Sequence, residues 1–151
     1  MKHLKDADVL NHLRTEVYVR IQPSPQHGVG IFAIRDIPAG VDPFQTSRLE
    51  LTFVWCPIDE LQGDPSIPDD VKQYVMDMCI RRDGKVRLPS CGMNGIMPRY
   101  YMNHGDTPNV RVGESGEFET IRRICAGEEL IADYYTYSDE PDLAEQLVAA
   151  K

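Results

Sequence analysis

The stretches of alternating apolar and polar residues in this chain are all short, and glycine or proline follows closely on most of them. In the segment 16–21, Val17, Val19 and Ile21 alternate with other residues, and prolines and a glycine follow between 23 and 28. Alternation over about six residues predicts a half-buried β-strand. Similar strand-like segments recur at 30–34, 49–55, 85–88, 110–112, 118–121 and 129–132. Many short strands at close spacing predict a mostly β domain, of the β-rich α+β class.

Helical periodicity is confined to three places, which are residues 6–14, 66–81 and 138–151. The first places Val9 and Leu13 on one face, and the second begins with acidic residues in its first turn. In the third, Ser138 can cap a helix that carries an apolar stripe. We therefore expect an N-terminal helical extension at 1–15, a main domain at 16–137 with a helical insert at about 56–95, and a C-terminal helix at 138–151.

Charge and hydropathy exclude some classes of function. The chain has 151 residues, enough for one domain, and a formal net charge of -8. No run of Lys and Arg suggests direct nucleic-acid binding. An acidic balance fits either solubility or an acidic groove for a basic peptide, and composition leaves both open. The start has no secretory signal and no apolar stretch could cross a membrane, so a soluble, intracellular and cytoplasmic protein is expected.

The four cysteines are scattered, with no C-x-x-C pair. Their spacing resembles no zinc site, so we expect no metal and four reduced, mostly buried thiols. The sequence predicts no oligomeric state.

Three motifs stand out, and each also has a plain structural interpretation. The first is His27-Gly28-Val29-Gly30, just before a strand; two glycines here indicate either a hairpin turn or a close backbone approach to a ligand. The second, 101–109, places Asn103 and His104 ahead of a Pro-Asn pair and could be an Asx-type turn. The third, 127–134, is a strand that ends in Asp133-Tyr134, whose tyrosine could simply pack and hydrogen-bond.

In this order and spacing the three motifs resemble the SET family of protein lysine methyltransferases, in a minimal, stand-alone form spanning residues 17–137. The resemblance implies a SET fold of several small curved sheets with a knot-like C-terminal segment. It also implies S-adenosyl-L-methionine as the methyl donor and a Lys-containing protein or peptide as the substrate. Its cofactor-binding residues would be Gly28, Val29, Gly30, Tyr101, Asn103 and His104, and its catalytic residue Tyr134. Candidates for the lysine channel are Tyr137, Ala132 and Tyr74.

The sequence departs from the family at several of these places. Tyr100 stands where Arg is common, with Arg99 one place earlier, and Gly105 replaces a frequent serine. Ala132 stands where an aromatic residue is usual, and a smaller side chain there would leave room for more methyl groups. The zinc-binding cysteine-rich tail of many members is absent, so the C-terminal helix would have to act as the lid. These departures keep a second hypothesis open, a non-catalytic SET-like module that binds peptides.

Overall fold

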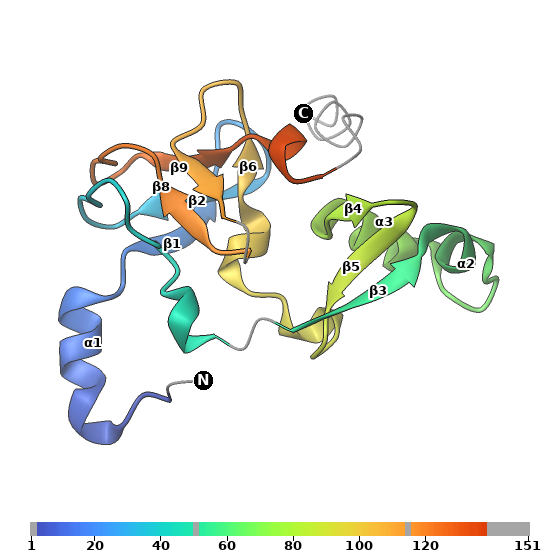
Figure 1. Ribbon diagram of the computed structural model, residues 1–151, viewed down its shortest axis with the longest axis horizontal. Helices are drawn as coiled ribbons and strands as arrows, with labels where there is room; N and C mark the ends of the chain where they lie inside the picture. Colours follow the sequence, from blue (N-terminus) through green and yellow to red (C-terminus); the bar gives the residue numbers. More distant parts are fainter. Residues whose placement is uncertain (1–2, 50–51, 114–115, 139–151) are drawn as a thin grey trace.

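Residues 3–49, 52–113 and 116–138 are described by the computed structural model, and they form several small sheets with short helices between them (Figure 1). The chain is thus a β-rich α+β protein, which confirms the fold class expected from the short alternating segments. Two lobes can be followed in Figure 1. The main lobe contains the first and last strands, and the insert lobe is built from residues 53–89.

The largest sheet belongs to the main lobe and has the strand order β1-β2-β9-β6. Its strands are β1 (Val19–Pro23), β2 (Val29–Ala33), β6 (Asn103–His104) and β9 (Glu129–Ala132). β2 pairs antiparallel with both β1 and β9, whereas β6 runs parallel to β9 at the edge. Because β2, β6 and β9 each carry part of one motif, this sheet brings together three segments that lie far apart in the sequence.

The main lobe is completed by the hairpin of β7 (Val110–Val112) and β8 (Phe118–Thr120). The Asn109 side chain fastens this region to the sheet: its amide nitrogen donates to Glu129 O at 2.8 Å and its oxygen accepts from Ile131 N at 2.8 Å. The lobe's core consists of Ile31, Ala33, Ile37, Met102, Val110, Phe118, Ile124, Leu130 and Ala132.

The insert lobe has its own sheet, in the order β3-β5-β4. The strands are β3 (Phe53–Pro57), β4 (Arg81–Arg82) and β5 (Lys85–Pro89), and the helices are α2 (Ile58–Gly63) and α3 (Asp69–Met78). A smaller core holds these elements together, formed by Leu61, Val75, Cys79 and Val86.

Outside these lobes, α1 (Val9–Thr15) follows the 3-10 helix η1 (Asp6–Asp8), as the N-terminal periodicity predicts. Its apolar face does not enter a core, since Leu10 is 62% and Leu13 53% exposed. Further 3-10 helices of the described residues lie at Thr46–Arg48 (η2), Met93–Gly95 (η3), Pro98–Tyr101 (η4) and Tyr134–Thr136 (η5). α2 was not predicted. The expected C-terminal helix lies, from residue 139 onward, outside the described residues.

The expectation of mostly buried cysteines is wrong. All four are free thiols, but only Cys79 is buried, while Cys91 and Cys125 are exposed and Cys56 is intermediate. Cys91 and Cys125 lie in turn segments outside both cores, where a thiol has no apolar surroundings to enter. Within the described ranges no three His, Cys, Asp or Glu side chains are grouped as metal ligands would be. The helices seen there are also too short or too polar to cross a bilayer.

Candidate functional site

The two glycines of the first motif have different structural roles. Gly28 has φ +48°, a left-handed conformation that L side chains rarely adopt, and the space around its missing Cβ is open. Gly30 is buried in β2, where a Cβ would lie 2.1 Å from Glu129 Oε1 and 3.0 Å from Asn103 Nδ2. Gly28 therefore shapes the turn, and Gly30 makes room for side chains of the other two motifs.

Asn103 fastens the second motif to the first. Its amide nitrogen donates to His27 O at 3.2 Å, to Val29 O at 3.0 Å and to Glu129 Oε1 at 2.8 Å. Glu129 in turn accepts a hydrogen bond from the Ser24 hydroxyl, 2.8 Å from each carboxylate oxygen. Because these bonds occupy the amide nitrogen of Asn103, only its oxygen is left for a ligand.

Tyr134 is held at both of its ends by the second motif. Its backbone N–H donates to His104 Nδ1 at 3.0 Å, and its hydroxyl donates to the backbone oxygen of Met102. The end of the third motif thus lies against the second motif, while the threading of the following segment through a loop stays a prediction. Burial, with a smaller contribution from the Glu129 charge, raises the pKa of the Tyr134 hydroxyl. The hydroxyl is therefore protonated throughout the physiological range.

All three motifs meet around a cavity of about 240 Å³, called here the motif cavity. It is lined by His27, Gly28, Val29, Tyr74, Asp77, Met78, Tyr100, Tyr101, Met102, Asn103 and Tyr134. Six of the residues predicted from the sequence are among them: Gly28, Val29, Tyr74, Tyr101, Asn103 and Tyr134.

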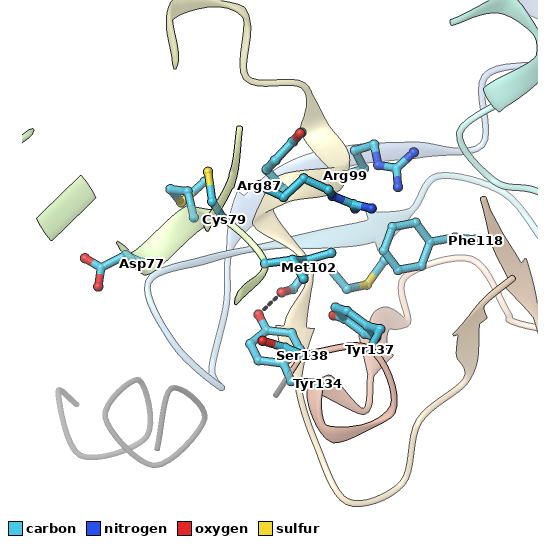
Figure 2. Close-up of a pocket in the computed structure, with 12 residues that line it drawn as sticks. Asp77, Cys79, Arg87, Arg99, Met102, Phe118, Tyr134, Tyr137 and Ser138 are labelled. Carbon is cyan, nitrogen blue, oxygen red and sulfur yellow. Dashed lines mark hydrogen bonds between the residues drawn. The ribbon is translucent and has the colours of Figure 1, made fainter. Parts of the chain in front are cut away.

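A second cavity, of about 60 Å³, adjoins the first and is called here the arginine cavity (Figure 2). Arg87, Arg99, Phe118, Tyr137 and Ser138 line it together with Cys79 and Ile80. Five further residues line both cavities, namely Asp77, Met78, Tyr100, Met102 and Tyr134. Tyr134 therefore stands on the wall that the two cavities share.

The remaining predicted site residues lie elsewhere. Tyr137 lines only the arginine cavity, and burial raises the pKa of its hydroxyl well above the ordinary value. Gly30 and His104 lie behind the motif cavity, where they position Asn103 and Tyr134. Ala132 is completely buried in the main core and lines neither cavity, because its side of β9 faces inward.

Several site residues were not recognised from the sequence. Glu129 joins the three motifs. The sequence feature that could have identified it is a carboxylate directly before the buried strand residue Leu130, in the run Gly-Glu-Glu-Leu. Met102 supplies the oxygen that holds the Tyr134 hydroxyl. Arg87 and Arg99 approach from different lobes, so no local pattern predicts that they line one cavity.

No protein-family model matches the chain, and neither does any curated protein. Among solved structures, a provisionally named histone methyltransferase of Plasmodium falciparum aligns with 78% of this chain and 92% of its own. The aligned residues are 17% identical and the TM-score is 0.48. This likeness is too weak to assign a function, so the assignment below rests on the residues of the site.

Proposed function

We propose that the protein is an S-adenosyl-L-methionine-dependent methyltransferase that acts on a lysine of a protein or peptide. The observation that carries this proposal is the position of Tyr134 between two adjoining cavities, one of which is lined by residues of all three motifs. A group-transfer site needs this arrangement, because donor and acceptor must approach one point from different sides. In this proposal residues 16–137 form the catalytic domain, and the insert supplies Tyr74.

The motif cavity fits the donor's chemistry. Gly28 lines it, and it presents the backbone around Val29 and the oxygen of Asn103, which can accept from an ammonium group. The rings of Tyr74, Tyr100 and Tyr101 provide faces that suit an adenine or a sulfonium cation. Its volume is just below the roughly 300–1,000 Å³ of typical ligand pockets. Part of a donor of this size would therefore extend beyond the cavity. When bound, the donor supplies a methyl group activated by attachment to a sulfonium.

The residues of the arginine cavity are suited to keep the acceptor amine neutral. A free lysine has a pKa of about 10.4 and is protonated at neutral pH. Burial among Tyr134, Tyr137 and Phe118 disfavours the ammonium form, and the nearby guanidinium groups disfavour it further. The amine would therefore lose its proton to solvent before the transfer, and its free lone pair would form the new N–C bond as the methyl leaves sulfur.

Tyr134 orients the amine and does not act as the base. Its raised pKa keeps the hydroxyl protonated, and its hydrogen is donated to Met102 O. The lone pairs of the hydroxyl oxygen stay available to accept an N–H of the amine, which aims the nitrogen lone pair at the donor methyl. Positioning of this kind contributes several kcal/mol to a group transfer without any protein nucleophile or metal.

The first experiment tests donor binding, because it needs no knowledge of the substrate. S-adenosyl-L-methionine and its demethylated product are titrated calorimetrically into the wild type, Asn103→Ala and Tyr74→Ala. We expect a dissociation constant in the micromolar range, a loss of about tenfold or more for Asn103→Ala, and a smaller loss for Tyr74→Ala. Asn94→Ala, on the exposed surface of η3, is the matched control and should bind normally.

Tyr74→Ala keeps the test decisive if Asn103→Ala fails to fold, because Tyr74 is 40% exposed and contributes little to the core. Absence of binding to the folded wild type would overturn the proposal. Binding without transfer to any lysine in a peptide screen, with Tyr134→Phe as the inactive control, would favour the non-catalytic peptide-binding module instead.

A further inference from the structure

Arg99 brings a largely unused cationic group to the arginine cavity. The residue is only 7% exposed, in an acidic protein with 24 Asp and Glu against 16 Lys and Arg. One terminal nitrogen, Nη2, donates to Gly116 O, and Cζ lies 5.0 Å from the centre of the Phe118 ring. The other, Nη1, is buried and has no hydrogen-bond partner among the described residues. A buried donor without a partner costs free energy and needs an explanation such as an absent ligand.

Arg87 lines the same cavity from the insert lobe, and Figure 2 shows both arginine side chains on the side opposite Tyr134 and Tyr137. The Arg87 guanidinium lies 4.1 Å from the centre of the Phe53 ring. In the part of the chain that the structure describes, it makes no ion pair or hydrogen bond. The two guanidinium groups thus line one cavity, each beside an aromatic ring, with Arg99 buried and Arg87 partly buried.

Among the described residues, neither arginine forms an ion pair with a carboxylate. Asp42 and Glu117 favour the charged form of Arg99 from nearby, but neither forms an ion pair with it within the described ranges. Among the described residues that line the cavity, Asp77 is the one carboxylate, and in Figure 2 it lies at the end away from Arg99. Desolvation lowers the pKa of both arginines, and the charge of Arg99 lowers that of Arg87 further. An anion between them would relieve both effects.

We propose that the arginine cavity binds a carboxylate of the substrate, which makes lysines with an acidic group close by the preferred targets. The forked guanidinium matches a planar carboxylate with two parallel N–H bonds, and Nη1 of Arg99 is free to give one of them. A volume of about 60 Å³ suits a small planar group better than a phosphate ester. The proposal rests on the proposed function for its substrate and deepens it by naming the group beside the target amine.

The charge balance of the site gives a reason for this preference. A lysine that approaches Tyr134 faces two guanidinium charges, which favour the neutral amine but also oppose the entry of a cation. A carboxylate on the same substrate, seated on the arginines, removes that repulsion at the entry step. The expected consequence is discrimination in binding, which appears in KM. The same carboxylate weakens the effect of the guanidinium charges on the pKa of the amine, so no gain in kcat is expected.

The first test of this proposal needs neither donor nor peptide. Acetate is titrated at constant ionic strength, with chloride as the balancing anion, and the Arg side-chain N–H signals are followed by NMR. We expect saturable shifts at Arg87 and Arg99 in the wild type, loss of the Arg99 shift in Arg87→Gln, and no change for the exposed control Arg20→Gln. Arg87→Gln is preferred to Arg99→Gln, because Arg87 is only partly buried and its loss threatens folding less. No saturable shift at either arginine in the wild type would overturn the proposal.

The second test identifies the source of the carboxylate. Lysine peptide libraries with capped ends carry either Glu or Gln at the positions flanking lysine, and a third library carries a free C-terminal carboxylate next to a Gln-flanked lysine. We expect kcat/KM of the wild type to be about tenfold higher for one of the two carboxylate libraries, through KM, and the ratio to fall to about one in Arg87→Gln. Equal rates for all three libraries, or a preference that Arg87→Gln retains, would overturn it. The acetate titration does not depend on the methyl donor. Failure of this proposal, seen as absent acetate binding, is therefore distinguishable from failure of the proposed function, seen as absent donor binding.

Discussion

The main lobe and the insert lobe contribute to the same two cavities from cores of very different size. The main core has nine buried members, of which Ile31, Ile37, Ile124, Leu130 and Ala132 have no exposed surface at all. The insert core has four buried members, and among them only Val86 is completely buried. A smaller core stabilises its surroundings less, so local opening is expected first in the insert lobe.

The difference matches how each lobe holds its site residues. In the main lobe Asn103, Glu129 and Tyr134 are fixed by hydrogen bonds that run between strands of one sheet and the segment after β9. In the insert lobe Tyr74 and Asp77 lie on α3, and Tyr74 is 40% exposed. The main lobe thus fixes its cavity-lining side chains by hydrogen bonds between its strands, whereas the cavity-lining side chains of α3 are less constrained.

The largest effect that would test this comparison comes from one substitution made in both lobes. Leu130→Ala removes a side chain with no exposed surface from the main core, whereas Leu61→Ala removes one that is 7% exposed from the insert core. Leu→Ala substitutions in cores cost about 2–5 kcal/mol, and the cost rises with the cavity that cannot collapse. We expect Leu130→Ala near the upper end of this range and Leu61→Ala near the lower end, measured by urea unfolding.

Hydrogen exchange on the same variants locates the loss. Leu61→Ala should speed exchange within residues 53–89 and leave β2 and β9 protected, whereas Leu130→Ala should affect the whole main sheet. Equal costs and identical exchange patterns would show that the lobes unfold as one unit, and the comparison would then fail.

An intermediate effect is expected from a matched pair of glycines. Alanine at Gly30 would place a methyl group against Glu129 and Asn103, while alanine at Gly63, at the end of α2, meets no atom within 4 Å. Gly30→Ala must displace Glu129 from its partly buried hydrogen bonds, at a cost of about 1–3 kcal/mol. Gly63→Ala should be neutral or slightly stabilising. Thermal unfolding measures both, and a neutral Gly30→Ala would mean that Glu129 does not join the motifs.

The elements of the main lobe could be predicted from the sequence because each has a local signal. The sequence predicts β1, β2 and β9 to within three residues at each end, and glycine turns mark β7 and β8. The three motifs also contain Gly28, Asn103 and Tyr134, which the structure brings together around the motif cavity, while their functional roles stay a prediction. The parallel pairing of β6 with β9 could not be predicted in this way. Only two residues of β6 take part, which is too few to show an alternating pattern.

The insert lobe was less predictable because fewer of its features have a local sequence signal. Its second helix followed from the spacing of Val71 and Val75, but α2 is six residues long and too short to show a period. The placement of Ala132 in a substrate channel came from the family pattern alone, and the structure places its side chain in the main core. Arg87 and Arg99 share a cavity only because the lobes pack together, which no local pattern records.

The smallest effect concerns Cys79, whose reactivity reports on the insert core alone. Burial raises the pKa of the Cys79 thiol to about 11, and the residue is 1% exposed, whereas Cys91 and Cys125 are exposed. Because the thiolate is the reactive form, Cys79 should react with iodoacetamide at about pH 8 much more slowly than Cys125. Mass spectrometry of the labelled peptides gives both rates.

The raised pKa also fixes the direction of a pH effect on stability. An unfolded cysteine has a pKa of about 8.5, so below this pH the thiol is protonated in both states and stability is unaffected. Above it the unfolded chain releases a proton that folded Cys79 retains up to about pH 11, and stability therefore falls as the pH rises. Cys79→Ala should remove this loss and Cys125→Ala should not.

If Cys79 instead labels as fast as Cys125 while β2 and β9 stay protected from exchange, the insert lobe opens by itself in the native protein. The wall it gives to both cavities would then be a mobile one.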